Sequence, residues 1–414
     1  MADTIKIEDI EERVVLVGVS EQDGDDADDS LSELAELVKT AGATVVGTLI
    51  QRREKIHPGT YVGTGKVAEI AELVESTGAT GIVCDDELSP AQQKNLETYL
   101  DTKVMDRTLV ILDIFASRAT TSEGKIQVEL AQLKYRLSRL SGLGKSMSRL
   151  GGGIGTRGPG EKKLEMDRRL IKNRIALLNR ELRSVKQHRE VTREKRAKSR
   201  IPVAAIVGYT NAGKSTLLNV LTGADILAED KLFATLDPTT RSLKLPSGQE
   251  ILLTDTVGFI RKLPHHLVDA FKSTLEEAAC SDIILKIADA SDSEAAEQLS
   301  VTDEVLNDLG CGDIPQVTVY NKCDRTGVAP YDPDVLLVSA KTGYGLDSLL
   351  AKIDEILAHR VRTIEVLLPY DKLALADVFR TRGSVLAEEY RENGVYYKAT
   401  VKVDDLHRFE AYLL

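Results

Sequence analysis

Residues 201–220 read IPVAAIVGYTNAGKSTLLNV, and this stretch decides the fold. The apolar segment Ile201–Val207 has the length and composition of one buried strand. It leads into the glycine-rich segment Gly208–Ser215, which has the spacing GxxxxGKS, and then into a helix-forming run. Glycines let the backbone wrap around phosphate groups, and the N–H groups at the start of the helix attract anions. The order strand, loop, helix therefore predicts a phosphate-binding loop for a nucleoside triphosphate.

Side chains with specific chemistry accompany this loop. Lys214 is expected to reach the β- and γ-phosphates, and the Ser215 hydroxyl is expected to bind Mg²⁺. Further along, Ile251–Asp255 predicts a strand that ends in a carboxylate beside the metal, and Gly258 can offer its N–H to the γ-phosphate. The nucleotide contacts predicted from these two motifs are Gly208, Tyr209, Thr210, Asn211, Ala212, Gly213, Lys214, Ser215, Thr216, Asp255, Thr256, Val257 and Gly258.

Two later motifs predict which base is bound. Asp324, which ends the sequence Asn321-Lys322-Cys323-Asp324, can accept hydrogen bonds from N1 and N2 of guanine, and adenine lacks these donors. A strand predicted at Val335–Val338 ends in Ser339-Ala340-Lys341, whose backbone can contact guanine O6. Each short motif is common by chance, but all four occur here in order at predicted strand ends. The predicted cofactors are therefore GTP or GDP with Mg²⁺.

The segment between the phosphate-binding loop and Asp255 must sense the γ-phosphate. We expect nucleotide contacts from Phe233, Ala234, Thr235, Leu236 and Asp237. Thr235 is the preferred sensing threonine, with Thr239 second and Thr240 a further candidate. The predicted metal ligands are then Ser215 and Thr235, and the predicted catalytic residues are Lys214, Thr235 and Gly258.

Phe259 follows this glycine, at a position where many small GTPases carry a glutamine that orients the attacking water. A phenyl ring cannot make a hydrogen bond of that kind. We therefore predict slow GTP hydrolysis by the isolated protein and faster hydrolysis when a partner orders the nucleotide-sensing segments.

The rest of the chain divides into four parts. We expect an N-terminal parallel-sheet α/β domain at residues 1–118, a basic helical hairpin at 119–199, a GTP-binding domain at 200–359 and a small α+β domain at 360–414. In the first part the expected strands are Arg13–Ser20, Ala43–Ile50, Gly81–Asp85 and Lys103–Met105. The helices expected there are Ser30–Ala41, Gly65–Ser76 and Pro90–Leu100. In the last part we expect a strand at Thr363–Leu368, a helix at about Leu373–Phe379 and a hairpin that turns at Asn393-Gly394.

The hairpin is predicted by two apolar seams of 3-4 and seven-residue spacing, which begin at Ile126 and Leu164. Between them, Ser141–Gly160 contains eight glycines among twenty residues and is predicted as a loop. Two antiparallel helices need only a few residues to connect, so a basic loop of this length is typical of a contact element. A flexible connector is the alternative.

Charge is distributed unevenly over the 414 residues. The net charge is −11, yet Lys125–Arg200 contains 22 Lys and Arg against 7 Asp and Glu, a local balance of +15. A basic segment on an acidic protein indicates a polyanionic partner at that segment, although a solvated basic helix face is an equal reading on charge alone. No apolar run reaches the ~20 residues of a membrane-spanning helix. The N-terminus lacks a signal-peptide pattern and the four cysteines lack metal-ligand spacing, so we expect a cytoplasmic protein.

A second glycine-rich sequence, His57–Lys66, contains GxGK ahead of a predicted helix. It could bind a phosphate of ATP, but it lacks the full loop spacing, and a structural turn is the favoured interpretation.

Three sequences together resemble the HflX family of GTPases. They are the segment Asp106–Leu140, the loop GGGIGTRGPGE that starts at Gly151, and GYTNAGKSTLLN with the later FATLDPTTR. The resemblance implies a factor that binds the large ribosomal subunit and splits or rescues stalled ribosomes. It also implies that Gly151–Gly160 approaches ribosomal RNA and that the loop, switch and base-reading motifs contact GTP, including Asn321, Lys322, Cys323, Asp324, Ser339, Ala340 and Lys341.

The expected RNA contacts are Lys145, Arg149, Gly151, Gly152, Gly153, Arg157 and Gly158. The expected partners are the large ribosomal subunit and its RNA, with no DNA, no stable membrane insertion and a monomeric state. Two alternatives remain open: a GTP-switched module that binds a protein target, and an RNA-remodelling NTPase with a second, ATP-binding site in the N-terminal domain.

Overall fold

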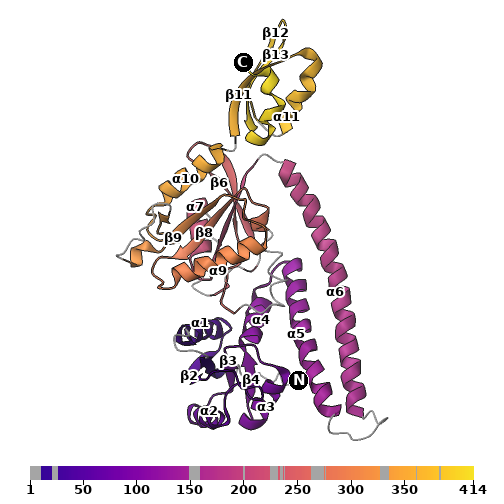
Figure 1. Cartoon of the computed structure of the whole chain (residues 1–414), viewed down its shortest axis with the longest axis vertical. Coiled ribbons are helices and arrows are strands. Elements are labelled where there is room, and N and C mark those ends of the chain that lie inside the picture. The colour runs from indigo at the N-terminus through magenta and orange to yellow at the C-terminus, as the bar shows by residue number, and fades with distance from the viewer. Residues whose placement is uncertain are drawn as a thin grey trace, which may run out of the picture. The chain divides into compact units, whose positions relative to one another are not determined.

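The fold is described from a computed structural model (Figure 1). The described residues are 11–20, 27–148, 159–198, 201–223, 232–233, 236, 238–262, 275, 277–326, 335–359, 361–381 and 384–414. The chain forms two compact units. The first contains Met1–Leu182 with Glu229–Leu236 and Ile260–Phe271, and the second contains Arg183–Ala228, Asp237–Phe259 and Lys272–Leu414.

The first unit contains a parallel sheet of the expected class. Its strands are β1 (Arg13–Ser20), β2 (Thr44–Arg52), β3 (Gly81–Cys84) and β4 (Lys103–Asp106), in the order β2-β1-β3-β4. The connecting helices are α1 (Ala27–Thr40), α2 (Thr64–Thr77) and α3 (Pro90–Leu100), within a few residues of their predicted bounds. All strand pairs are parallel because each connection crosses over through a helix. Buried valines of β1 lie at the centre of this core.

Helix α4 (Arg107–Arg118) was not predicted from the sequence. Its Asp106 N-cap accepts a hydrogen bond from the N–H of Leu109. Apolar residues on several sides of the helix are buried, among them Val110, Ile111 and Phe115. Its buried residues Val110, Ile111, Ile114 and Phe115 recur at three- and four-residue spacing, so the sequence did carry a helical signal here.

The helical hairpin is formed by α5 (Ser122–Ser148) and α6 (Pro159–Lys198), which run side by side in opposite directions (Figure 1). The predicted loop Ser141–Gly160 is too long, because helix α5 continues to Ser148 and α6 already begins at Pro159. Lys145 therefore lies on α5 and not in a loop. The other predicted RNA contacts, Arg149, Gly151, Gly152, Gly153, Arg157 and Gly158, lie outside the described residues.

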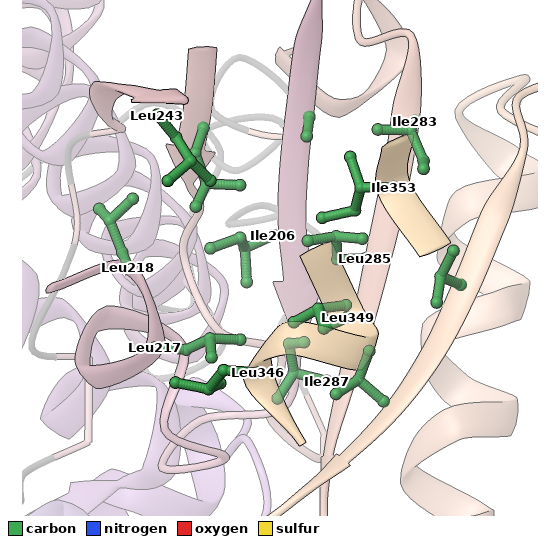
Figure 2. Packing of buried hydrophobic residues seen from close by; sticks show 14 of the residues in the cluster. Ile206, Leu217, Leu218, Leu243, Ile283, Leu285, Ile287, Leu346, Leu349 and Ile353 are labelled. Atoms are coloured by element: carbon green, nitrogen blue, oxygen red, sulfur yellow. The ribbon is translucent and has the colours of Figure 1, made fainter. Parts of the chain in front are cut away.

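The second unit contains the six-stranded sheet that carries the motifs. Its strands are β5 (Val203–Gly208), β6 (Thr239–Lys244), β7 (Glu250–Asp255), β8 (Ile283–Asp289), β9 (Gln316–Asn321) and β10 (Leu336–Leu337), in the order β10-β9-β8-β5-β7-β6. Among these six strands, only β6 runs antiparallel to its neighbour. Its helices include α7 (Lys214–Thr222), α9 (Ala295–Asp308) and α10 (Leu346–His359). Figure 2 shows aliphatic side chains of α7 and α10 packed against those of the strands, including Leu217, Leu285 and Leu349.

A small three-stranded sheet ends the chain. It consists of β11 (Val361–Leu368), β12 (Ser384–Arg391) and β13 (Gly394–Lys402), all antiparallel in the order β11-β13-β12. The predicted hairpin at Asn393-Gly394 connects β12 and β13. The predicted helix Leu373–Phe379 is instead a 3₁₀ turn (Tyr370–Leu375) followed by α11 (Ala376–Thr381), and further 3₁₀ turns lie at Val403–Arg408 and Glu410–Tyr412. None of the helices that the structure describes is long and apolar enough to cross a membrane.

Candidate functional site

The phosphate-binding loop forms where β5 ends and α7 begins. Gly213 caps α7 with a left-handed backbone (φ 87°). A Cβ atom there would lie 2.3 Å from the side-chain nitrogen of Asn321, and one at Gly208 would lie 2.1 Å from the carbonyl oxygen of Ile287. Both positions therefore require glycine for reasons of space as well as conformation. The loop is thus packed closely against the ends of β8 and β9.

Lys214 is the first residue of α7 and is 6% exposed. Its Nζ atom donates a hydrogen bond of 2.6 Å to the carbonyl oxygen of Tyr209 in the same loop. Burial lowers the pKa of Lys214 to about 8, because desolvation disfavours its charged form and outweighs the nearby charge of Asp255. An ammonium group in this position is suited to bind phosphate, which would replace the lost hydration.

Asp255, at the end of β7, lies beside the start of α7. Its Oδ2 atom accepts a hydrogen bond of 2.7 Å from the hydroxyl of Ser215. The pair offers one hydroxyl and one carboxylate oxygen, and Mg²⁺ in nucleotide sites takes such ligands together with phosphate oxygens and water. Among the described residues no group of three or more His, Cys, Asp or Glu side chains could hold a metal ion without such help. The predicted ligand Thr235 lies outside the described residues.

Gly258 and Phe259 are held against the phosphate-binding loop. The Phe259 N–H donates to the Gly208 carbonyl (3.1 Å), and the Thr210 N–H donates to the Phe259 carbonyl (2.8 Å). A Cβ atom at Gly258 would approach the Thr210 Cα and the Lys214 Nζ to 2.8 Å. The Phe259 ring is buried at 3% exposure. The ring is thus packed away from solvent, in keeping with its inability to orient a water molecule.

The region between the loop and β7 is described only in part. Phe233 and Leu236 lie among the described residues, whereas Ala234, Thr235 and Asp237 lie outside them. Thr239, the second candidate for the sensing threonine, begins β6 and pairs with Asp255 of β7. Which threonine senses the nucleotide therefore stays open, because the preferred candidate, Thr235, lies outside the described residues.

The two base-reading motifs meet at the ends of β9 and β10. The side chain of Asn321 donates to the Ala212 carbonyl (2.9 Å) and accepts from the Ala340 N–H (3.0 Å), so it joins both motifs to the phosphate-binding loop. The Ser339 hydroxyl donates to Asp324 (2.6 Å) and lowers the pKa of that carboxyl. Asp324 is therefore ionised at neutral pH, as an acceptor for guanine N1–H and N2–H requires.

Sequence reasoning missed Asp289 in this site. Asp289 ends β8 and forms an ion pair of 2.8 Å with Lys322, which has a left-handed backbone (φ 62°). The sequence could have indicated Asp289, because β8 lies between β5 and β9, and a polar residue that ends such a strand lies at the same edge of the sheet.

Side chains and backbone groups around the second glycine-rich sequence, His57–Lys66, form contacts with other residues of the N-terminal domain. Lys66 pairs with Glu69 (2.6 Å) within α2, and the Gly63 N–H donates to the side chain of Gln51 (2.7 Å). Tyr61 and Val62 are buried. These contacts agree with the interpretation of this sequence as a structural turn.

Comparison with known proteins extends over nearly the whole chain. Family models match residues 28–116 (GTP-binding GTPase N-terminal), 118–196 (GTP-binding GTPase middle region) and 203–322 (50S ribosome-binding GTPase). The chain is 61% identical over 406 residues to the GTPase HflX of Lacrimispora saccharolytica, covering 97% of this chain and 96% of that protein. It is 41% identical to the GTPase HflX of Escherichia coli, covering 93% and 92%.

One solved structure is that of a GTP-binding protein from the archaeon Sulfolobus solfataricus in complex with GDP. It is 28% identical, covers 84% of this chain and 99% of its own, and has a TM-score of 0.46.

Proposed function

This chain belongs to the HflX family of GTPases, and from that premise we propose that it binds the large ribosomal subunit and couples GTP hydrolysis to the splitting or rescue of stalled ribosomes in the cytoplasm. The hydrolysis of GTP is the activity of the family. We propose which ribosomal subunit the protein binds and what GTP hydrolysis accomplishes there. The division of the chain into four domains is also a proposal.

The observation that carries the proposal is the basic hairpin. The segment Lys125–Arg200, to which most of α5 and all of α6 belong, contains 22 Lys and Arg against 7 Asp and Glu, whereas the rest of the chain is acidic. Arg174 and Glu129 join the two helices through hydrogen bonds of 2.7 and 2.9 Å. A stiff basic hairpin suits insertion between RNA helices, where charge and backbone contacts dominate recognition. Its tip contacts ribosomal RNA through the residues predicted above.

The same proposal assigns roles in the nucleotide site. Lys214 binds the β- and γ-phosphates, and the hydroxyl of Ser215 binds Mg²⁺ with Asp255 beside it. Thr235 senses the metal and the γ-phosphate, and Gly258 offers its N–H to the same phosphate. Mg²⁺ would supply charge neutralisation at the bridging oxygen. Asn321–Asp324 and Ser339–Lys341 select guanine.

A buried phenyl ring at position 259 supports partner-dependent hydrolysis. The side chain that follows Gly258 cannot orient water, so that function has to come from another group or from rearrangement on the ribosome. A GTPase that is slow alone and fast on its target hydrolyses GTP only where the work is performed.

Co-sedimentation tests the partner directly. The full-length protein, loaded with a non-hydrolysable GTP analogue, is centrifuged with purified large or small ribosomal subunits at two salt concentrations. We expect binding to the large subunit, weakened about tenfold between ~50 and ~200 mM salt because a few basic residues neutralise phosphates. Equal binding to both subunits would contradict specificity for the large subunit, and binding that salt leaves unchanged would contradict RNA recognition by a basic hairpin. A variant in which residues 149–158 are replaced by a Gly/Ser linker of equal length is the matched control.

A further inference from the structure

A buried charge cluster lies where β3 and β4 end in the first unit. Arg107, the first residue of α4, is 1% exposed. It forms ion pairs with Asp85 (3.1 Å) and Glu33 (2.7 Å), and it donates to the Ser30 carbonyl (2.8 Å). Its Nη1 atom also donates to the carbonyl oxygen of Arg261 at 3.0 Å, although the two residues are 154 positions apart in sequence. A buried guanidinium with all these partners holds its neighbours in one geometry.

Lys262 completes the cluster. Its Nζ atom lies 2.6 Å from Asp85 Oδ2 and 2.8 Å from Asp86 Oδ1. Burial by itself raises the pKa of the Asp85 carboxyl, but the charges of Arg107 and Lys262 outweigh burial and lower that pKa below its ordinary value. Asp86 is fixed in turn by the hydroxyl of Tyr61 (2.6 Å). The turn Arg261-Lys262 is therefore held at two points, one through its backbone and one through its side chain.

The backbone of Lys262 is strained. Its φ of 51° lies in the left-handed region, which costs an L-residue roughly 1–2 kcal/mol. Such a conformation persists only where the surroundings determine it. Here the determining contacts come from Asp85, Asp86 and Arg107, so the N-terminal residues impose the conformation of this turn.

The position of the turn links it to the reaction. Phe259, two residues before Arg261, is tied to the phosphate-binding loop by two backbone hydrogen bonds. Only Ile260, itself buried, separates the two anchored segments. Any shift of the Gly258 N–H toward a γ-phosphate would therefore act on a chain that is fixed three residues later, at Arg261. The nucleotide-sensing segment is also anchored at Phe233, whose ring packs edge-to-face on the ring of Phe115 in α4 (centroids 4.8 Å apart).

We propose that Asp85, Asp86 and Arg107 are positioning residues for GTP hydrolysis: they hold the Arg261-Lys262 turn and thereby bias the chain that carries Gly258 toward one nucleotide state. They contact neither the nucleotide nor the reacting atoms. The contrasting possibility is an ion-pair cluster that only stabilises the fold. The two differ in a measurable way, because thermodynamic linkage requires a state-selective contact to change the ratio of GTP and GDP affinities, whereas a purely structural contact leaves that ratio unchanged.

The test uses full-length Lys262→Met and, independently, Asp86→Asn. In Lys262→Met the buried Asp85 keeps Arg107 as its partner, so the fold is expected to survive. The dissociation constants of GDP and of a non-hydrolysable GTP analogue are measured with fluorescent nucleotides, and kcat and KM are measured separately. We expect both variants to change the GTP-to-GDP affinity ratio at least threefold and to change kcat by a factor different from that of KM. Lys262→Arg, which keeps the charge and can reach both carboxylates, should restore the ratio.

Lys103→Met is the control for the loss of a lysine ion pair, because Lys103 pairs with Glu12 at a similar distance (2.7 Å) on the exposed surface, far along the chain from the nucleotide motifs. It should leave both affinities unchanged. An unchanged affinity ratio in both Lys262→Met and Asp86→Asn, with melting temperatures that show folded protein, would overturn the proposal. Equal changes in the control would do the same.

Discussion

Lys214 shows how the nucleotide site is prepared for an anion at the scale of a single residue. The ammonium group is buried and donates to a backbone carbonyl, and the nearby charge of Asp255 only partly compensates its desolvation. Phosphate would supply the missing compensation. Binding energy is therefore concentrated where the β- and γ-phosphates are expected to lie.

The lowered pKa of Lys214 predicts how nucleotide affinity depends on pH. Because the pKa is about 8 before binding, and phosphate raises it on binding, the affinity for GDP should be constant below pH 8 and should fall above it. The decrease should approach about tenfold per pH unit while the bound form stays protonated. Titrations with a fluorescent GDP between pH 7 and 9.5 measure this dependence. A constant affinity over that range would show that Lys214 is already fully protonated, or is not a phosphate ligand.

Asp324 is the residue that selects the base. Asp324→Asn replaces one acceptor oxygen by an N–H₂ donor, which would face the N–H groups of guanine, so GDP affinity should fall at least ~100-fold. Xanthine carries an oxygen where guanine carries N2, and the variant should therefore bind xanthosine diphosphate better than GDP. Competition binding with the two diphosphates checks the prediction. Retention of normal GDP affinity would remove Asp324 from the base site.

At the scale of elements, helix α5 is attached to the N-terminal sheet by a charged contact. Arg139 of α5 donates to Asp106 at the end of β4 (2.5 Å), and Tyr135 of the same helix donates to the other oxygen of that carboxylate (2.8 Å). Arg139 also stacks on the ring of Tyr135 at 3.6 Å. Asp106 in turn caps α4 through the Leu109 N–H. One buried carboxylate thus joins a strand, a capped helix and the first helix of the hairpin.

This contact predicts unequal effects of two similar substitutions. Arg139→Met leaves the buried Asp106 without its cation and should lower the free energy of unfolding by about 3 kcal/mol or more. Arg174→Met removes an exposed pair with Glu129 and should lower it by less than ~1 kcal/mol. Denaturant unfolding of both variants measures the difference. Equal losses would mean that the carboxylate is satisfied by its other partners.

Elements that end in a motif could be predicted well from the sequence. Strands β5 and β7 are short apolar runs, and each ends within a residue of its predicted end because a glycine or a polar residue closes the buried segment. Helix α4 does carry a helical pattern, with apolar residues three and four positions apart that are buried. The start of the tip connection lies later than predicted, because the glycines after Leu140 do not end α5. Helix α5 tolerates Gly142 and Gly144 at a cost of ~1 kcal/mol each.

Contacts between segments that are distant in the sequence are the features that sequence patterns predict least well. The motif order indicated that Ser215 and Asp255 belong to one site, because the ends of neighbouring parallel strands meet at one sheet edge. No such rule predicts the contact of Arg107 with the Arg261 carbonyl, since a basic residue in an apolar stretch has many possible partners. The position of Asp289 at the end of β8 was predictable from the strand order, but its pairing with Lys322 was not.

For the whole molecule, an acidic GTPase carries one basic hairpin, which we propose binds RNA. Overall the chain carries a net charge of −11, so attraction to RNA is confined to the hairpin and its immediate neighbours. Such a distribution should orient the protein on a polyanionic surface as well as hold it there. The slow reaction expected from Phe259 then becomes fast only when the hairpin has found its target.

The most direct measurement is the rate of GTP hydrolysis at near-physiological salt, with and without purified large ribosomal subunits. It is made on the intact protein and on the variant with residues 149–158 replaced by a Gly/Ser linker. We expect a slow rate alone, strong stimulation by the subunit, and loss of most of that stimulation in the variant while GTP binding stays normal. Absence of stimulation in the intact protein, or full stimulation without the basic tip, would contradict a GTPase that is activated on the large subunit through its hairpin.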